Sequence, residues 1–453
     1  MAFLYIVTFV VFTYINIKNI LKDGYLSLFG LFYFTIAILY LLAPAIMFIN
    51  APNYQVWSIK TINESSTTDR LIAWFVIVVT LIVLNIAKRA RIKQFSVKTV
   101  IGQCRDERII NTVIRSVCKP WFIILFGIGG LGFLLLISQI GISGLVRLSG
   151  QSRGVTASIG GSGSVLGYGQ FLSKFLIAAM VPGILLYQTR KNGLLKILLL
   201  LLFAASLLIE IFVAGKSNFI IFAVPYLIYF FSDQHGKMRK SRLILLATLA
   251  LIAVFFLENL FYYLQYGVSV SIYRTSWESS DYISRYLREF AFAYANLLNS
   301  RAIVAKMGYR YFIDYPSVIV NLLPAVLLGG LQIKPAYTVV DSYYGIVGMQ
   351  SLSPADYMIF GILQLDYLGL LLITFFRGNI FKEIDNRFVT LRNAFNVAKI
   401  NGTHLLTCCA CFGVVCVLSE PFTAIRSQPI LICSILIGLS IYRKLIRMSV
   451  IEE

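Results

Sequence analysis

Long uncharged stretches of apolar residues recur along most of the chain, and they constrain its fold more than any other feature. A membrane-spanning helix needs about 20 predominantly apolar residues, whereas a membrane β-strand alternates apolar and polar residues. The stretches here are continuous, which excludes an outer-membrane barrel. Only 13% of the residues are charged, which is too few to cover a soluble surface. The sequence therefore predicts an all-α polytopic membrane protein.

About eleven apolar segments can be counted as transmembrane helices. They lie at about 2–17, 25–49, 71–87, 121–140, 171–187, 195–214, 218–232, 243–264, 356–376, 404–419 and 429–442. The first segment has no basic region before it and no small-residue cleavage site after it, so we expect a retained helix rather than a signal peptide.

The positive charge of the chain follows the predicted topology. The loop 88–119 carries nine Lys and Arg residues against two acids, and such loops lie in the cytoplasm. Alternation of the helices puts five other basic segments on the same side, so that these six segments hold 26 of the 40 basic residues. The net charge of +20 is thus largely a topological signal and does not indicate nucleic-acid binding. The N-terminus is predicted outside and the C-terminus in the cytoplasm.

Three larger loops are left outside, at 50–70, 141–170 and 265–355. The chain then has three parts, which are residues 1–264 with eight helices, the large loop 265–355, and residues 356–453 with three helices and a tail. A loop of that length is usually functional. Its residues Tyr282, Tyr286, Phe290, Ala293 and Leu297 recur at helical spacing, which predicts a partly helical loop.

Fourteen basic residues do not follow the positive-inside pattern, and several of them gather in the outside loops. Arg pairs bidentately with phosphate and stays charged, so an outside cluster indicates recognition of a lipid phosphate or pyrophosphate. Arg147 and Arg153 lie beside a run of glycines, and Lys216 occupies a tight turn. The alternative is that these are solvated or snorkelling cations.

The large loop adds a second group of charged and aromatic residues. Arg285, Arg288 and Glu289 lie within one turn of a predicted helix, where the alternative to a ligand site is a weak intrahelical ion pair. Arg301, Arg310, Asp314 and Tyr344 follow in the loop.

The two histidines, His235 and His404, fall in or beside predicted cytoplasmic segments. An external base would therefore be Glu, Asp or Tyr. The sequence shows no metal-spaced cluster and no nucleotide-binding motif, so no metal and no cofactor are expected.

In layout and at several positions the chain resembles the Wzy-type polymerases, which join lipid-linked repeat units of O-antigen and related polysaccharides. The matching positions are Gly215–Asn218, Arg288–Leu298 and Leu352–Pro354, the last before a helix that contains Gly361 and Gly369. Lys216 departs from the family pattern, since it stands where the family usually has Arg. The related O-antigen ligases typically use a His in the late loop, and none is present here, which favours a polymerase.

The resemblance implies a GT-C-like glycosyltransferase of the bacterial inner membrane that needs neither metal nor nucleotide. Donor and acceptor would be undecaprenyl-diphosphate-linked glycans bound at the periplasmic face, and a Wzz-type co-polymerase would set the chain length. The residues expected to act in catalysis are Glu289, Arg288, Asp314 and Tyr344. Those expected to bind pyrophosphate or substrate are Arg147, Arg153, Lys216, Arg285, Arg301 and Arg310. A flippase for the same lipid-linked unit and a ligase are the alternatives.

Overall fold

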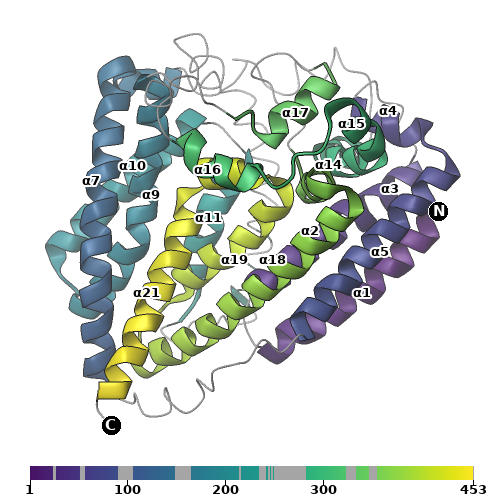
Figure 1. The fold of residues 1–453 in the computed structure, drawn as a ribbon. Coiled ribbons are helices and arrows are strands. Elements are labelled where there is room, and N and C mark those ends of the chain that lie inside the picture. The colour runs from purple at the N-terminus through teal and green to yellow at the C-terminus, as the bar shows by residue number, and fades with distance from the viewer. Residues whose placement is uncertain are drawn as a thin grey trace. The chain divides into compact units, whose positions relative to one another are not determined.

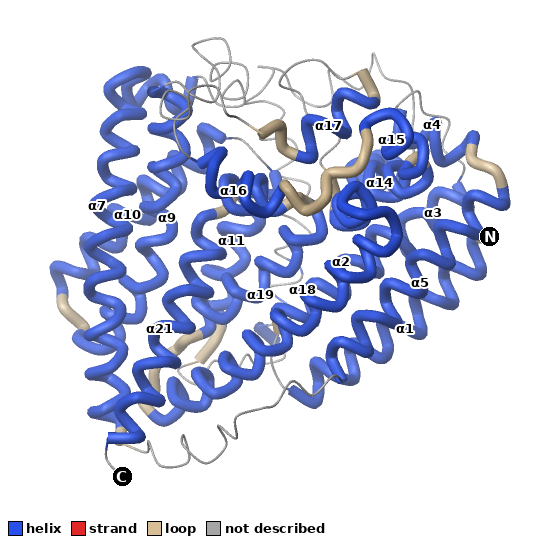
Figure 2. The backbone as a smooth tube through the Cα atoms, in the orientation of Figure 1, coloured by secondary structure: helices blue, strands red, loops and turns tan. Residues whose placement is uncertain are grey.

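The computed structural model consists of helices (Figures 1 and 2). It describes residues 1–23, 27–50, 57–89, 106–147, 165–213, 216–233, 241–242, 245, 248, 282–322, 333–345 and 355–451. No strand occurs within these ranges. The predicted all-α class is thereby confirmed.

Seven helices of the described chain are long and apolar enough to cross a membrane. They lie at Leu28–Ile49, Thr67–Arg89, Glu107–Leu145, Val165–Arg190, Gly193–Phe212, Tyr357–Val397 and Pro429–Met448. Three shorter apolar helices lie at Ala2–Lys18, Asn218–Phe231 and Thr403–Leu418. The chain is therefore a polytopic helical membrane protein. The remaining predicted segment, 243–264, lies almost wholly outside the described residues.

The chain divides into two compact units. Unit 1 comprises Met1–Arg91, Trp277–Glu383 and Ala410–Arg426. Its helices are α1 (Ala2–Asp23), α2 (Leu28–Ala37), η1 (Ile38–Leu42), α3 (Ala43–Asn50), α4 (Trp57–Glu64), α5 (Thr67–Arg89), α14 (Tyr282–Leu298), α15 (Ser300–Met307), α16 (Asp314–Leu322), α17 (Ala336–Tyr343) and α20 (Pro421–Ser427). The first part of α18 (Tyr357–Val397) and the second part of α19 (Thr403–Leu418) also belong to it.

Unit 2 comprises Ile92–Ser276, Ile384–Cys409 and Ser427–Glu453. Its helices are α7 (Glu107–Arg147), α9 (Val165–Arg190), α10 (Gly193–Val213), α11 (Lys216–Phe231) and α21 (Pro429–Ile451), together with the remainders of α18 and α19. Helices α7 and α9 pack closely, because a Cβ atom at Gly132 would lie only 2.3 Å from the backbone nitrogen of Ser173.

Both ends of the outside loop predicted at 141–170 are helical in the structure. Helix α7 continues to Arg147 and bends at Gly141, whose φ of +70° is open to glycine. The residues after this bend, among them Ile142 and Leu145, remain apolar, so the helix resumes instead of ending. Helix α9 begins at Val165, which also shortens the loop from its other end.

Hydrogen bonds in unit 2 connect ends of helices that the predicted topology puts on the same side of the membrane. The amide of Gln188 bonds the backbone of Asn401, and the Asn401 amide in turn donates to the carbonyl of Tyr229 at 3.3 Å. At the other end of α11, Gln428 donates to Asn218 at 2.8 Å. These contacts agree with the predicted alternation of the helices, because each bond joins two helix ends that it puts on the same side.

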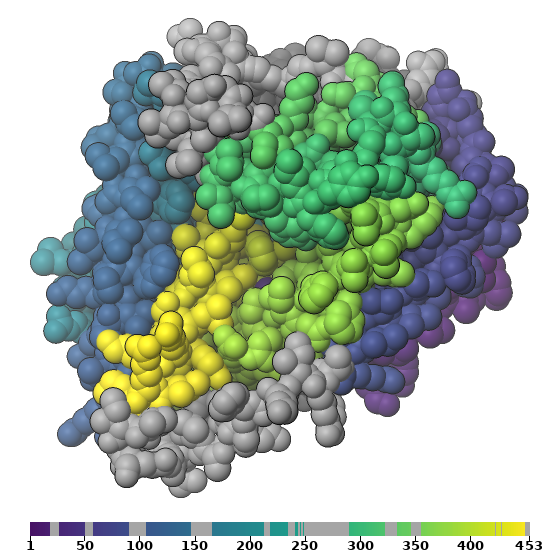
Figure 3. Space-filling model, in the orientation of Figure 1, coloured from purple at the N-terminus to yellow at the C-terminus, as the bar shows by residue number. Residues whose placement is uncertain are grey.

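The large loop is helical in its described parts, as its spacing predicts. Helix α14 covers the predicted periodic residues, and α15, α16 and α17 follow it (Figure 1). Figure 3 shows the green side chains of this segment as a layer directly against the lime-green side chains of α18. The candidate site residues Arg310, Asp314 and Arg377 lie in this layer and in α18.

Candidate functional site

A buried ion pair lies at the start of α16. The guanidinium of Arg310 donates two hydrogen bonds to the carboxylate of Asp314, at 2.6 and 2.7 Å, and a third to the Lys334 carbonyl at 2.6 Å. The Gln364 amide donates to the same carboxylate at 2.8 Å. The side chains of Arg310 and Asp314 are 12% and 2% exposed. Asp314 thus neutralises Arg310 with a bidentate geometry, and little of either group is left for a ligand.

Helix α18 is broken just beyond this pair. Leu365 and Asp366 have non-helical backbone angles, with a φ of +55° at Asp366. The first piece of α18, residues 357–364, is therefore a short half-helix, and the carbonyls at its end have no partner within the helix. The backbone N–H groups of Arg310 and Tyr311 donate to the carbonyls of Leu363 and Gln364, at 2.8 and 3.1 Å.

Two close contacts fix this break. A Cβ atom on Gly369 would lie 2.6 Å from the carbonyl oxygen of Gly361, so the two pieces of α18 approach each other where both residues are glycine. On the loop side, Tyr311 and Phe312 both have positive φ, which costs conformational energy in non-glycine residues. The Phe312 N–H donates to the Gln364 side chain at 2.8 Å and so helps to hold this backbone in place.

A further carboxyl, that of Glu420, lies in electrostatic contact with the pair. It stands between α19 and α20, is 2% exposed, and accepts a hydrogen bond from the Ala336 N–H at 3.0 Å. Burial and the negative charge of Asp314 raise the pKa of the Glu420 carboxyl to about 7. We call Arg310, Asp314, Gln364 and Glu420 the paired site, because each polar side chain in it has a protein partner.

A second buried network surrounds Asp356, directly before α18. Its carboxylate accepts hydrogen bonds from the Tyr40 hydroxyl and from the Asn296 amide, the latter at 2.8 Å. It also accepts from the first N–H groups of α18, so it acts as the N-cap of the half-helix. Burial raises the pKa of Asp356 to about 6. The Tyr344 hydroxyl bonds to Asn296 and Asn299, both at 3.2 Å, and burial raises its pKa.

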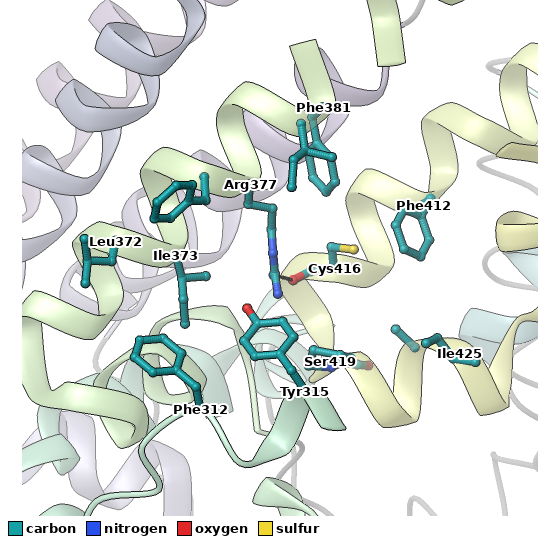
Figure 4. A pocket seen from close by; sticks show the side chains of 14 residues that line it. Phe312, Tyr315, Leu372, Ile373, Arg377, Phe381, Phe412, Cys416, Ser419 and Ile425 are labelled. Carbon is teal, nitrogen blue, oxygen red and sulfur yellow. Dashed lines mark hydrogen bonds between the residues drawn. The ribbon is translucent and has the colours of Figure 1, made fainter. Parts of the chain in front are cut away.

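An apolar cavity of about 580 Å³ lies in unit 1, lined by α18, α19, α20 and the start of α16 (Figure 4). One cation, Arg377, lines it. Arg377 donates to the Cys416 carbonyl at 3.0 Å and lies over the Tyr357 ring at 5.1 Å. Figure 4 shows the Tyr315 hydroxyl pointing toward the guanidinium. We call this cavity and its lining the Arg377 pocket.

The charge of Arg377 has no acidic partner among the described residues. A cation within an apolar helix is costly unless something compensates it, and such residues commonly mark substrate or ion sites. A planar guanidinium in an apolar pocket suits an anionic head group attached to a hydrocarbon chain. The contrast with the paired site makes Arg377 the strongest candidate ligand-binding residue of unit 1.

The segment predicted to span the membrane at 356–376 ends just before Arg377, and Arg377 opens one of the basic segments predicted in the cytoplasm. The helix itself does not end there, because α18 continues to Val397. Arg377 lies within this helix and lines one pocket with Tyr315, a residue of the large outside loop. The charge of the residue suggested a helix end, whereas the structure uses it inside the helix.

The structure describes the side chains of some predicted site residues and not of others. Arg153 lies outside the described residues. The side chains of Arg147, Lys216, Arg285, Arg288 and Glu289 also lie outside them, although their backbones belong to α7, α11 and α14. Arg301 is exposed and lies 5.8 Å from the ring centroid of Tyr367. Arg310 and Asp314 are brought together, and Tyr344 belongs to the separate Asp356 network.

No group of three or more His, Cys, Asp or Glu side chains suited to a metal occurs in the described part of the chain. No family model, no curated protein and no solved structure matches the chain.

Proposed function

We propose that the protein is a membrane glycosyltransferase that polymerises undecaprenyl-diphosphate-linked repeat units into a surface polysaccharide. The observation that carries this proposal is the Arg377 pocket. Its apolar walls suit a polyprenyl chain, and its single cation lacks an acidic partner and suits a diphosphate. The likeness to the Wzy-type polymerases noted in the sequence supports the same reaction. About eleven spans, a GT-C-like arrangement and a site on the periplasmic face of the bacterial inner membrane belong to this proposal.

The proposed reaction transfers the growing glycan from its lipid diphosphate to the incoming unit. A hydroxyl oxygen of the acceptor bonds to the anomeric carbon of the donor, while the bond from that carbon to the diphosphate oxygen breaks. Undecaprenyl diphosphate leaves with the electron pair, and the hydroxyl proton passes to a carboxylate. Arg377 would stabilise the charge that develops on the leaving diphosphate.

The carboxylate that we propose for the proton is Glu289, next to Arg288. Asp314 suits this role less well, because both of its oxygens accept hydrogen bonds from Arg310 or Gln364. Tyr344 likewise has its hydroxyl bonded to two amides. The remaining predicted anion binders, Arg147, Arg153, Lys216, Arg285 and Arg301, stay part of the proposal on sequence grounds, as does a Wzz-type partner.

The proposal is tested by complementing a deletion strain and separating its polysaccharide on a gel. The wild-type gene should restore long ladders, and Arg377→Ala should leave single repeat units. Arg387→Ala is a matched control, because Arg387 lies on the same helix and over another tyrosine ring, that of Tyr442, at 5.7 Å. It should give normal ladders. Equal membrane levels of the variants are verified by immunoblotting.

The other outcomes each identify a different error. Normal ladders from Arg377→Ala would remove the pocket from the reaction. Complete absence of polysaccharide in the deletion strain would instead indicate a flippase or a ligase.

A further inference from the structure

Unit 2 contains a group of buried polar side chains among apolar helices. Its members are Ser206 and Glu210 on α10, Tyr226 on α11 and His404 on α19, with exposed fractions of 0, 2, 4 and 2%. We call these four residues the buried cluster. Glu210 lies within a candidate membrane span, and His404 lies in a shorter apolar helix. An ionisable residue in that setting needs a partner or a function.

Ring contacts hold three helices of the buried cluster together. Phe203 on α10 lies 5.3 Å from the ring of Tyr226, and Tyr226 lies 4.5 Å from the ring of His404. Ser206 and Glu210 follow Phe203 at i+3 and i+7, so they share its face of α10. Tyr226 also interacts electrostatically with Glu210. The four residues therefore belong to one continuous region.

Five polar atoms of the buried cluster have no hydrogen-bond partner among the residues that the structure describes. They are Ser206 Oγ, Glu210 Oε2, the Tyr226 hydroxyl oxygen, and both ring nitrogens of His404. Native proteins rarely leave buried polar atoms unsatisfied, because each one loses its hydration without compensation. Apolar side chains of similar size would avoid this cost. The retention of four such residues in one place indicates a use other than packing.

The buried cluster extends along the helices rather than across them. Glu210 lies in the last turn of α10, at the end joined to α11, and His404 is the second residue of α19. The Asn401 amide donates to the Tyr229 carbonyl, which places the start of α19 at the opposite end of α11. Along α10, Phe203 and Ser206 are about 4.5 Å apart in axial rise, and Ser206 and Glu210 about 6 Å.

We infer that Glu210, Ser206, Tyr226 and His404 form a proton relay through unit 2. Carboxyl, hydroxyl and imidazole groups each donate and accept protons, and a row of them without other hydrogen-bond partners suits proton transfer. The other titratable groups that face the relay are Lys174 toward Glu210, Cys408 toward Tyr226, and Tyr229 toward His404. This inference is independent of the proposed function, because the proposed diphosphate pocket belongs to unit 1.

The test uses the full-length protein in liposomes that contain a pH-sensitive dye. A potassium gradient with a potassium ionophore sets a membrane potential, and the dye reports proton entry without any glycan present. We expect the wild type to acidify the interior severalfold faster than protein-free liposomes. Glu210→Gln should abolish the excess, and His404→Gln should reduce it severalfold.

Glu64→Gln is the matched control, since the Glu64 side chain is 66% exposed and lies far from the relay in sequence. It should conduct like the wild type. Ser206→Ala, a conservative change, provides a second variant if Glu210→Gln does not yield folded protein, and it should slow proton entry severalfold. Size-exclusion profiles establish folding. Proton entry at the protein-free rate, or at the wild-type rate in both Glu210→Gln and His404→Gln, would overturn the relay.

Discussion

Arg310 and Arg377 lie in the same unit, yet their surroundings are opposite. Arg310 donates three hydrogen bonds to oxygen acceptors, two of them to a buried carboxylate. Arg377 has one carbonyl, two tyrosine rings nearby and a cavity. An arginine paired with a carboxylate stabilises the fold, whereas an arginine without an acidic partner can bind an anion. The difference teaches that the partners of an arginine, rather than its residue type, separate a structural charge from a binding charge.

Removing the Asp314 carboxylate from the paired site should give the largest effect. Asp314→Ala leaves Arg310 buried and uncompensated, which typically costs about 3–5 kcal/mol. We expect a markedly lower apparent melting temperature in detergent. Glu64→Ala, which breaks a Lys60–Glu64 pair of the same spacing but with both side chains about two-thirds exposed, should change it little. Equal melting temperatures of the two variants would show that the paired site is not structural.

Glu420 tests the same site through pH. The pKa of Glu420 is raised in the folded chain. Its contribution to the free energy of unfolding is therefore complete below its ordinary pKa of 4.5 and is lost as the pH rises through about 7. The loss amounts to about 3 kcal/mol. Glu420→Gln stays neutral, so its melting temperature should fall less than that of the wild type between acidic and alkaline buffer. Parallel melting curves over this range would contradict a neutral Glu420 in the folded state.

A substitution in the Arg377 pocket should change lipid binding and not the stability of the fold. Arg377→Ala should weaken binding of undecaprenyl diphosphate by about 10- to 100-fold, which corresponds to the loss of a charged hydrogen bond. Binding of undecaprenol, which has the chain without the phosphates, should be unchanged. Native mass spectrometry of the purified protein measures both. An equal loss for the two lipids would mean that Arg377 only shapes the cavity.

Tyr315→Phe should give the smallest effect. It removes the hydroxyl that points toward Arg377 but keeps the ring that lines the pocket. One neutral hydrogen bond contributes about 0.5–1.5 kcal/mol, so diphosphate binding should weaken only severalfold. An effect as large as that of Arg377→Ala would shift the main anion contact to Tyr315.

Hydrophobic pattern predicted the elements better than it predicted the site. Apolar length and helical spacing sufficed for most spans and for α14, because these depend on local sequence. Arg310 and Asp314 were singled out as an anion binder and a catalytic residue. Their pairing with each other depends on the folded structure, and charge alone does not reveal it. Arg377 was not singled out, because a charge after an apolar run resembles a helix end.

Asp356, Gln364 and Glu420 were not singled out from the sequence at all. Each is a lone polar residue beside or within an apolar segment, without a motif around it. Their partners are mostly distant in sequence, such as Asn296 for Asp356 and Ala336 for Glu420. A lone acid or amide beside an apolar span is the signal that could have drawn attention to them.

The break in α18 has a consequence for how the chain enters a membrane. The half-helix 357–364 has eight residues and cannot cross a bilayer of about 30 Å by itself. Its terminal carbonyls are bonded by backbone N–H groups that are made about 50 residues earlier in the chain. During biosynthesis the loop segment therefore emerges first and is available when the half-helix arrives. Insertion of this part of the protein is completed by folding, not by hydrophobicity alone.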